Sequence, residues 1–217
     1  MRAFAAGWLA RLFKHAPEVP IERVRWVVLD CESSGLDPRA DRLLAIGAID
    51  VEGGRIGLGS GFSVVLRQET PSDASNIVIH GISGSAQLAG TEPREALMRF
   101  ADYADECPLV AFHAPFDRTL LGRAYDEAGL RLQNRWLDLA ALAPALRPEH
   151  AQRCKALDDW LGIFGIENPR RHDALSDAFA TGLLFQVLVA DARAQGVRTC
   201  AQLQRAAQEG RWLSAGR

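Results

Sequence analysis

The stretch from Val24 to Glu32, VRWVVLDCE, decides the fold of this 217-residue chain. Its first part is a continuous β-prone run, typical of a strand buried on both faces. Side chains two residues apart share one face of a strand, so Asp30 and Glu32 leave the same face, whereas Cys31 points the other way. Burying two like charges together is costly without a cation, and hard divalent metals prefer carboxylate oxygens. The pair indicates a metal site, although a solvated strand end is an equal alternative on this pattern alone.

The rest of the chain alternates strand and helix signals. Strands are predicted over 43–51, 61–66, 109–112 and 136–139, and Gly53-Gly54 indicates a hairpin. Helices are predicted over 95–105, 116–128, 157–161, 174–194 and from Thr199 to near Gly210. This order predicts one α/β domain with a mixed β-sheet flanked by helices. We place the domain at 23–195, with an N-terminal helical extension at 1–22 and a C-terminal one at 196–217.

The residues before Pro20 are predicted to be an appendage. A short helix that ends at Pro17 would carry an apolar face. A helix packed on its own domain is the plainer interpretation, and a helix that docks a protein partner or lies on a membrane surface is the alternative. The apolar face would consist of Phe4, Trp8, Leu9, Leu12 and Phe13.

The composition is that of an ordinary globular protein, with 48% hydrophobic and 24% charged residues. A net charge of −2 argues against a protein that coats long stretches of nucleic acid, because such binding neutralises many phosphates. It does not argue against an enzyme that holds a few nucleotides at one end. The four cysteines form no CxxC pair, so we expect free thiols and no zinc site. No apolar run approaches the ~20 residues of a membrane span, and we expect a cytoplasmic protein.

Two later motifs place titratable side chains at the starts of helices. In the segment 110–117, VAFHAPFD, a buried strand breaks at Pro115 and a helix begins near Asp117. In the segment 172–178, HDALSDA, His172 stands at the start of the long helix and Asp177 about one turn inside it. Taken alone, Asp117 could simply favour the positive end of its helix dipole, and His172 could be an ordinary helix-end residue. Asp177 is harder to explain in this way, because a carboxylate near a core face needs a partner.

Together these motifs resemble the three exonuclease motifs of the DEDD superfamily. The position of the histidine is similar to that in the DEDDh branch, the family of the proofreading epsilon subunit of bacterial DNA polymerase III. The likeness covers roughly Arg25 to Val189, most of the chain. The segments that carry it are Asp30 to Gly35, Phe116-Asp117, His172 with Asp177 five residues later, and IHGIS at 79–83.

The resemblance implies an RNase H-like fold and two bound Mg²⁺ or Mn²⁺ ions. It implies that His172 is the general base, which takes a proton from the attacking water. By motif position it assigns metal ligation to the carboxylates of Asp30, Glu32, Asp117 and Asp177. It also implies that the terminal nucleotide contacts Ser33, Ser34, Gly35, Leu36, His80, Phe112, His113 and Phe116.

The chain departs from the family pattern in two motifs. Ser33 and Ser34 replace the usual threonines, so the hydroxyls remain but the methyl groups that pack against the sugar are lost. Phe112 and His113 replace the usual His-Asn pair. His113 either binds the substrate strand or stabilises its own turn, and Phe112 either stacks on a base or lies in the core. Leu36 either lies against the terminal base or anchors its loop.

We therefore predict an enzyme that removes nucleotides from the 3′ ends of single-stranded DNA. An exoribonuclease that trims RNA 3′ ends is the first alternative, because the same motifs serve both, and recognition of the terminal 2′-OH would distinguish them. A catalytically silent module that binds nucleic-acid ends or docks on a partner is the second. The four clustered carboxylates favour an enzyme, because a silent module would have no reason to keep them uncompensated.

Overall fold

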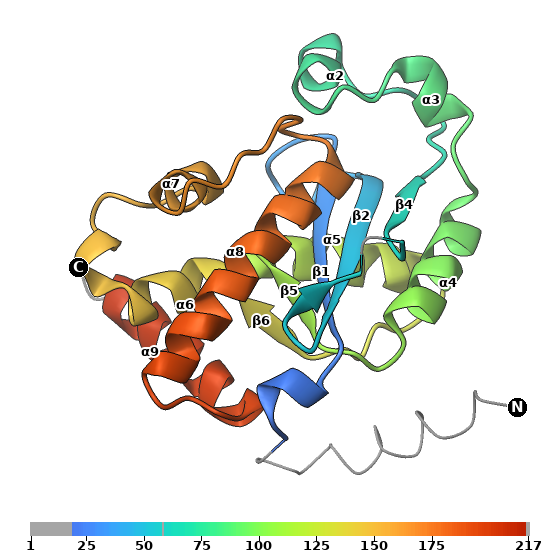
Figure 1. Cartoon of the computed structure of the whole chain (residues 1–217). Coiled ribbons are helices and arrows are strands. Elements are labelled where there is room, and N and C mark those ends of the chain that lie inside the picture. Colours follow the sequence, from blue (N-terminus) through green and yellow to red (C-terminus); the bar gives the residue numbers. More distant parts are fainter. Residues whose placement is uncertain (1–18, 58, 216–217) are drawn as a thin grey trace, which may run out of the picture.

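The computed structural model describes the backbone of residues 19–57 and 59–215, and the side chains of these residues as far as Gly210. Figure 1 shows a central sheet with helices on both of its faces. The helix predicted before Pro17 lies outside the described residues. The predicted domain boundaries, after residue 22 and after residue 195, stay predictions.

The described strands form one six-stranded sheet with the order β3-β2-β1-β5-β6, and β4 pairs with β2 as well. β1 is central, antiparallel to β2 and parallel to β5, and β6 continues the parallel side. This sheet confirms the predicted mixed α/β architecture. The strand bounds are β1 Trp26–Ser33, β2 Leu43–Glu52, β3 Arg55–Ile56, β4 Phe62–Val65, β5 Leu109–Ala111 and β6 Trp136–Asp138.

The helices cover the two faces of this sheet unequally. The longest, α8, crosses one face against β1 and β2, while α4 and α5 lie on the other side (Figure 1). Two short helices, α2 and α3, lie beyond the end of the sheet where β1 finishes. The helix bounds are α2 Ala74–His80, α3 Gly84–Leu88, α4 Pro93–Ala104, α5 Ala114–Glu127, α6 Leu139–Leu146, α7 Leu157–Ile163, α8 Ala174–Ala194 and α9 Cys200–Ala215, with 3₁₀ turns at Ile21–Arg23 and Pro148–His150.

The alternation of side chains along β1 divides the core into two layers. Trp26 and Val28 belong to the apolar cluster under α8, whereas Val27, Leu29 and Cys31 belong to the cluster under α4 and α5. Cys31 is therefore a buried core residue, as predicted. The even-numbered Asp30 and Glu32 consequently face the layer that contains α8.

Three helices have no counterpart in the sequence prediction. The helices α2 and α3 are too short to show an apolar period, and α2 exposes Val78 to solvent. The helix α6 reads LAALAPAL, which is almost uniformly apolar and contains Pro144, so it shows no amphipathic pattern and carries a helix-breaking residue. Its first residue, Leu139, falls within the strand predicted over 136–139.

The helix α8 is long and apolar enough to cross a membrane by length and composition. In this fold it is a core helix, because Ala178, Leu184 and Phe185 are buried against the sheet. The last helix, α9, packs on α6 through Gly210, where a Cβ atom would lie 2.1 Å from the carbonyl oxygen of Ala141. The C-terminal helix thus shares the core of the sheet layer that contains α8.

Candidate active site

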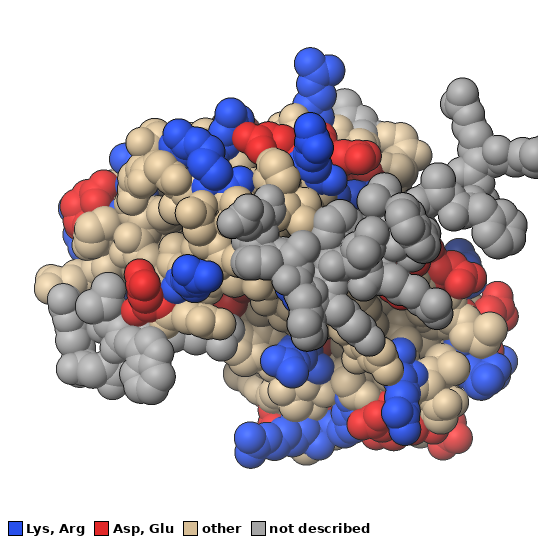
Figure 2. All heavy atoms as spheres, turned by 90° about the horizontal axis from the view of Figure 1, so that it is seen from below, with Lys and Arg blue, Asp and Glu red and all other residues tan. Residues whose placement is uncertain are grey.

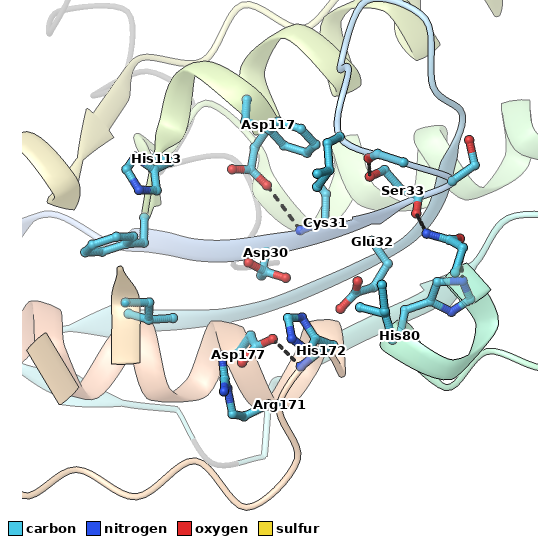
Figure 3. Close-up of a pocket in the computed structure, with 18 of the residues that line it drawn as sticks. Asp30, Cys31, Glu32, Ser33, His80, His113, Asp117, Arg171, His172 and Asp177 are labelled. Carbon is cyan, nitrogen blue, oxygen red and sulfur yellow. Dashed lines mark hydrogen bonds between the residues drawn. The ribbon is translucent and has the colours of Figure 1, made fainter. Parts of the chain in front are cut away.

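Three carboxylates meet where the end of β1 faces the start of α8. Asp30, Glu32 and Asp177 each offer an oxygen, and these oxygens lie within 4.8 Å of one another. Figure 3 shows the three side chains pointing into the same space, with His172 beside them. Strand alternation predicted that Asp30 and Glu32 share a face, the family resemblance added Asp177, and the geometry brings the three of them together.

A glycine on the neighbouring strand allows this approach. Gly47 of β2 is the register partner of Asp30, and a Cβ atom on residue 47 would lie 2.2 Å from the backbone carbonyl carbon of Ala174. Only a residue without a side chain lets the first turn of α8 rest directly on β2. The contact fixes the height of Asp177 above the sheet.

The carboxylate of Asp177 is held from its other side by the loop before α8. The backbone N–H of His172 donates to Asp177 Oδ2 at 2.8 Å, and the amide of Asn168 donates to Oδ1. Ser176 Oγ donates to Asn168 Oδ1 at 2.8 Å, which orients that amide. His172 has a left-handed backbone with φ of 61°, unusual for a residue other than glycine. Its exposed imidazole is thereby carried on a tightly fixed backbone.

Asp117 occupies a different position from the other three acids. It lies in the first turn of α5, is 4% exposed, and accepts a hydrogen bond from the backbone N–H of Cys31 at 3.1 Å. Figure 3 shows it across β1 from Asp177. Asp117 lines the same cavity as Asp30, Glu32 and Asp177, but it does not belong to their cluster of oxygens within 4.8 Å.

Burial makes these carboxylates reluctant to ionise. Desolvation, followed by the charges of Asp117, Glu32 and Asp177, raises the pKa of Asp30 well above its ordinary range. Burial, then the charge of Asp177, raises the pKa of Glu32 to about 8. Burial raises the pKa of Asp117 to about 7, and burial also raises the pKa of Asp177. Near neutral pH these acids can all be ionised together only if a cation compensates their charge.

The donor set fits a divalent metal ion. Glu32 Oε1 is buried and has no hydrogen-bond partner among the described residues. A buried polar atom normally has a partner, and a bound metal ion would supply one here. The four acids predicted as ligands offer carboxylate oxygens, which are the atoms that Mg²⁺ and Mn²⁺ prefer. The site therefore has the chemistry of a hard-cation centre.

A cavity of about 910 Å³ opens over these acids. Every residue that the sequence predicted for the site lines it, together with Asn76, Ile79 and Asp158, which the sequence did not assign to it. Arg171 lines it as well; the sequence leaves this residue between a phosphate contact and a solvated position. Leu36, at the tip of the loop after β1, is 95% exposed, and Ile79 of α2 is 56% exposed. The cavity thus joins an acidic floor to an apolar rim.

His80 lines the cavity, but its side chain is largely buried. It is 5% exposed, and its Nδ1 accepts from the backbone N–H of Ile82 at 2.9 Å, so Nε2 carries the proton and donates to Asn76 Oδ1 at 2.8 Å. Asn76 in turn donates to the carbonyl of Ser33 at 3.2 Å. His80 thus connects α2 to the end of β1 through Asn76. The i, i+4 spacing of these two residues was the available signal, but the helix itself was not predicted.

The residues of the second motif divide between the core and the surface. Phe112 is 9% exposed and belongs to the apolar cluster under α8, while His113 is exposed and caps α5 with φ of 63°. Their rings meet edge to face, with centroids 4.8 Å apart. Phe112 thus lies in the core and His113 at the turn before α5, but both also line the cavity, so their contacts with a substrate stay predictions.

The serines of the first motif use their hydroxyl groups within their own loop. Ser33 Oγ donates to the carbonyl of Gly35, while Ser34 Oγ donates to Asp41 and accepts from the backbone N–H of Arg42. A Cβ atom on residue 35 would lie 2.5 Å from Asp41 Oδ2, so the Asp41 carboxylate occupies the space that a side chain would need. Both serine hydroxyl groups are therefore engaged in hydrogen bonds within the loop.

A mixed sheet of this order, with acids at the end of its central strand, defines the RNase H-like fold of the DEDD nucleases. Comparison of the sequence with protein families agrees with this class. The family model described as Exonuclease matches residues 27–185, and the chain belongs to this family.

Several proteins of known name are similar to this chain. The DNA polymerase III subunit epsilon-like protein of Rhodobacter capsulatus is 32% identical over 184 residues, which are 84% of this chain and 26% of that protein. The PolC-type DNA polymerase III of Bacillus cereus is 29% identical over 198 residues, which are 88% of this chain and 13% of that protein. The chain thus spans about a quarter, or less, of these relatives.

Solved structures of E. coli exonuclease I have the same fold. The complex with a dT13 oligonucleotide has a TM-score of 0.68 at 18% identity, over 80% of this chain and 42% of that one. The zinc-bound complex with single-stranded DNA has a TM-score of 0.67 at 19% identity, over 77% of this chain and 41% of that one. These likenesses establish the architecture.

Proposed function

We propose that the chain is a 3′–5′ exonuclease that hydrolyses the terminal phosphodiester bond of single-stranded DNA and releases nucleoside monophosphates. The observation that carries the proposal is the meeting of Asp30, Glu32 and Asp177 within 4.8 Å, at the floor of a cavity that also contains Asp117. E. coli exonuclease I, which shares the fold, has been solved with single-stranded oligonucleotides, and this supports the choice of substrate.

The four acids would hold two Mg²⁺ or Mn²⁺ ions. Bound there, the ions would stabilise negative charge on the attacking and leaving oxygens of the scissile phosphate. Glu32 brings an oxygen that the protein leaves unpartnered, and Asp30 brings a carboxylate that three neighbouring acids already crowd. Asp117 and Asp177 approach from opposite sides of β1, so the carboxylates surround the proposed metal site from two directions.

His172 is the proposed proton acceptor. Its backbone is tied to Asp177, so the imidazole stays beside the acidic floor while remaining exposed to the cavity. An imidazole is a common general base in enzymes because it can take a proton from water close to neutral pH. The loop that carries His172 also orients Asp177, so the proposed proton acceptor keeps a fixed position relative to this acid.

The terminal nucleotide would lie between the loop after β1 and helix α2. Leu36 and Ile79 supply an apolar rim on which a base can rest, and the loop 33–36 presents its backbone to the sugar. The Asn76–Ser33 hydrogen bond sets the distance between these two walls. Substrate position in this proposal depends on packing and backbone contacts.

The test is digestion of 3′-labelled and 5′-labelled strands of one sequence, as DNA and as RNA, with Mg²⁺, Mn²⁺ or EDTA. We expect release of labelled mononucleotide from the 3′-labelled DNA, complete inhibition by EDTA, and loss of activity in Asp30→Asn. Asp102→Asn, at an exposed position of α4, is the matched control and keeps full activity. Release from the 5′ end, faster digestion of RNA, or an active Asp30→Asn enzyme would contradict the proposal.

A further inference from the structure

A second groove adjoins the acidic cavity on the other side of the start of α5. It has a volume of about 960 Å³ and runs between α5, β6 and α9. Pro115 and Asp138 line both depressions, so the two meet at the N-terminus of α5. Any chain that leaves the acidic cavity past Pro115 enters this groove.

The groove has the opposite charge to the cavity. Arg39, Arg118 and Arg123 line it, and within the described residues neither Arg39 nor Arg118 has a carboxylate within 4.0 Å. The acids on its walls are Asp126, which is exposed, and Asp138, whose carboxylate accepts from the backbone N–H groups of Ala114 and Ala140 at 3.2 Å. The groove therefore offers a polyanion cationic side chains next to the acidic cavity.

One of these arginines is fixed in advance. The guanidinium of Arg123 donates to the carbonyl oxygens of Pro38 and Asp41, and its Nε pairs with Glu127 at 3.1 Å. It thereby attaches the loop that carries Leu36 and Arg39 to the side of α5. The loop that borders the acidic cavity and the wall of the groove are therefore one connected unit.

The surface of α5 that faces the groove is a single helical stripe. Its members, Pro115, Arg118, Thr119, Gly122, Arg123 and Asp126, follow the i, i+3, i+4, i+7 spacing of one helix face. They extend over roughly 16 Å, at about 1.5 Å per residue. In the middle stands Gly122, where a Cβ atom would meet nothing within 4 Å. A helical glycine that packing does not require weakens its helix and leaves the floor of the groove open to close approach.

The face at the opposite end of the sheet differs. Figure 2 shows its visible part from below, with basic and acidic side chains interspersed over it.

We propose, on the basis of the exonuclease function above, that this groove holds backbone phosphates of the single strand upstream of its 3′-terminal nucleotide. Arg39 and Arg118 pair with phosphate oxygens, Arg123 keeps the loop in place, and Gly122 lets the sugar–phosphate chain lie against the helix. The groove contributes length-dependent affinity without reading sequence, because it contacts the backbone.

The experiment compares a 20-nucleotide single strand with the p-nitrophenyl ester of thymidine 5′-monophosphate, which is too small to reach the groove. The variants are Arg118→Ala, the double variant Arg39→Ala/Arg118→Ala, and Gly122→Glu, which adds bulk and negative charge. Arg99→Ala, an exposed arginine of α4 outside both depressions, is the control. Binding of the 20-mer is followed in parallel by fluorescence anisotropy in EDTA over a series of salt concentrations.

We expect the double variant to raise KM for the 20-mer at least 10-fold and to change turnover of the ester less than 2-fold. Loss of two phosphate contacts reduces the slope of log K against log salt by about 1.4, at about 0.7 per contact for single strands. Equal effects on the 20-mer and the ester, or no effect of any variant on 20-mer affinity and salt slope, would overturn the proposal. If the wild type hydrolyses neither substrate, the exonuclease function fails, and the anisotropy series still decides on the groove.

Discussion

Replacing Glu32 with glutamine removes one charge from the acidic floor while keeping the shape of the side chain. Glu32 is 8% exposed, and one of its oxygens has no partner among the described residues. Its folded-state pKa is raised from 4.5 to about 8, mainly by burial and then by Asp177. The folded protein therefore binds this proton more tightly than the unfolded chain does. Stability from this group is fully present below pH 4.5 and is lost as the pH rises toward 8.

The size of the effect follows from the same values. The interval from 4.5 to about 8 corresponds to roughly 5 kcal/mol at most, at about 1.4 kcal/mol per pKa unit. We expect Glu32→Gln to be more stable than wild type by about 2–5 kcal/mol at pH 8.5 in EDTA, and of equal stability near pH 4. For a domain of this size the melting temperature would rise by roughly 5–15 °C.

The assay is urea unfolding of both proteins in EDTA from pH 4 to 8.5, repeated with Mg²⁺. Wild type should gain stability from Mg²⁺ at high pH, and Glu32→Gln should gain much less, because the ion no longer relieves that charge. Glu106→Gln, at an exposed position, is the control for a simple change of net charge. A Glu32→Gln protein that is no more stable than wild type at pH 8.5 in EDTA would refute the idea of an uncompensated carboxylate.

Other consequences of the structure are open to measurement. His172→Ala should lower kcat by about 10²–10⁴-fold, the usual contribution of a general base, with less than 3-fold change in Mn²⁺ affinity by calorimetry; parallel losses would contradict its role as proton acceptor. Gly47→Ala should destabilise the fold by about 1–3 kcal/mol or more by urea unfolding and reduce activity, because the methyl group meets the backbone of α8. Gly162→Ala, with open space at its Cβ, should show neither effect. Asn76→Ala should raise KM roughly 5-fold through loss of the contact to Ser33, at about 1 kcal/mol per hydrogen bond, and a change confined to kcat would argue against positioning.

The sequence predicted the sheet and the acids because both leave strong local signals. The buried run before Asp30 fixes β1, and period-2 alternation already placed Asp30 and Glu32 on one face and Cys31 on the other. The long apolar helix with Asp177 in its first turn was equally readable. These elements are specified by their own residues, so a single sequence is enough to locate them.

The parts that the sequence did not predict depend on contacts between distant segments. Gly47 is an unremarkable glycine in a strand until α8 is placed on it. Asn76 and His80 form a connection only because α2 is a helix, and its seven residues carry no periodic signal. The burial of the His80 ring was not predicted for the same reason, since it comes from tertiary packing of a segment to which the sequence assigned no element.

The closeness of α8 to β2 at Gly47 has a consequence for the order in which the site is assembled during synthesis. A growing polypeptide that has emerged from the ribosome only as far as β6 already contains Asp30, Glu32 and Asp117, but it still lacks Asp177 and His172. The last acid is added with α8, the helix that covers one face of the sheet. In the proposed exonuclease, the set of acids is therefore complete only when that face of the sheet is covered.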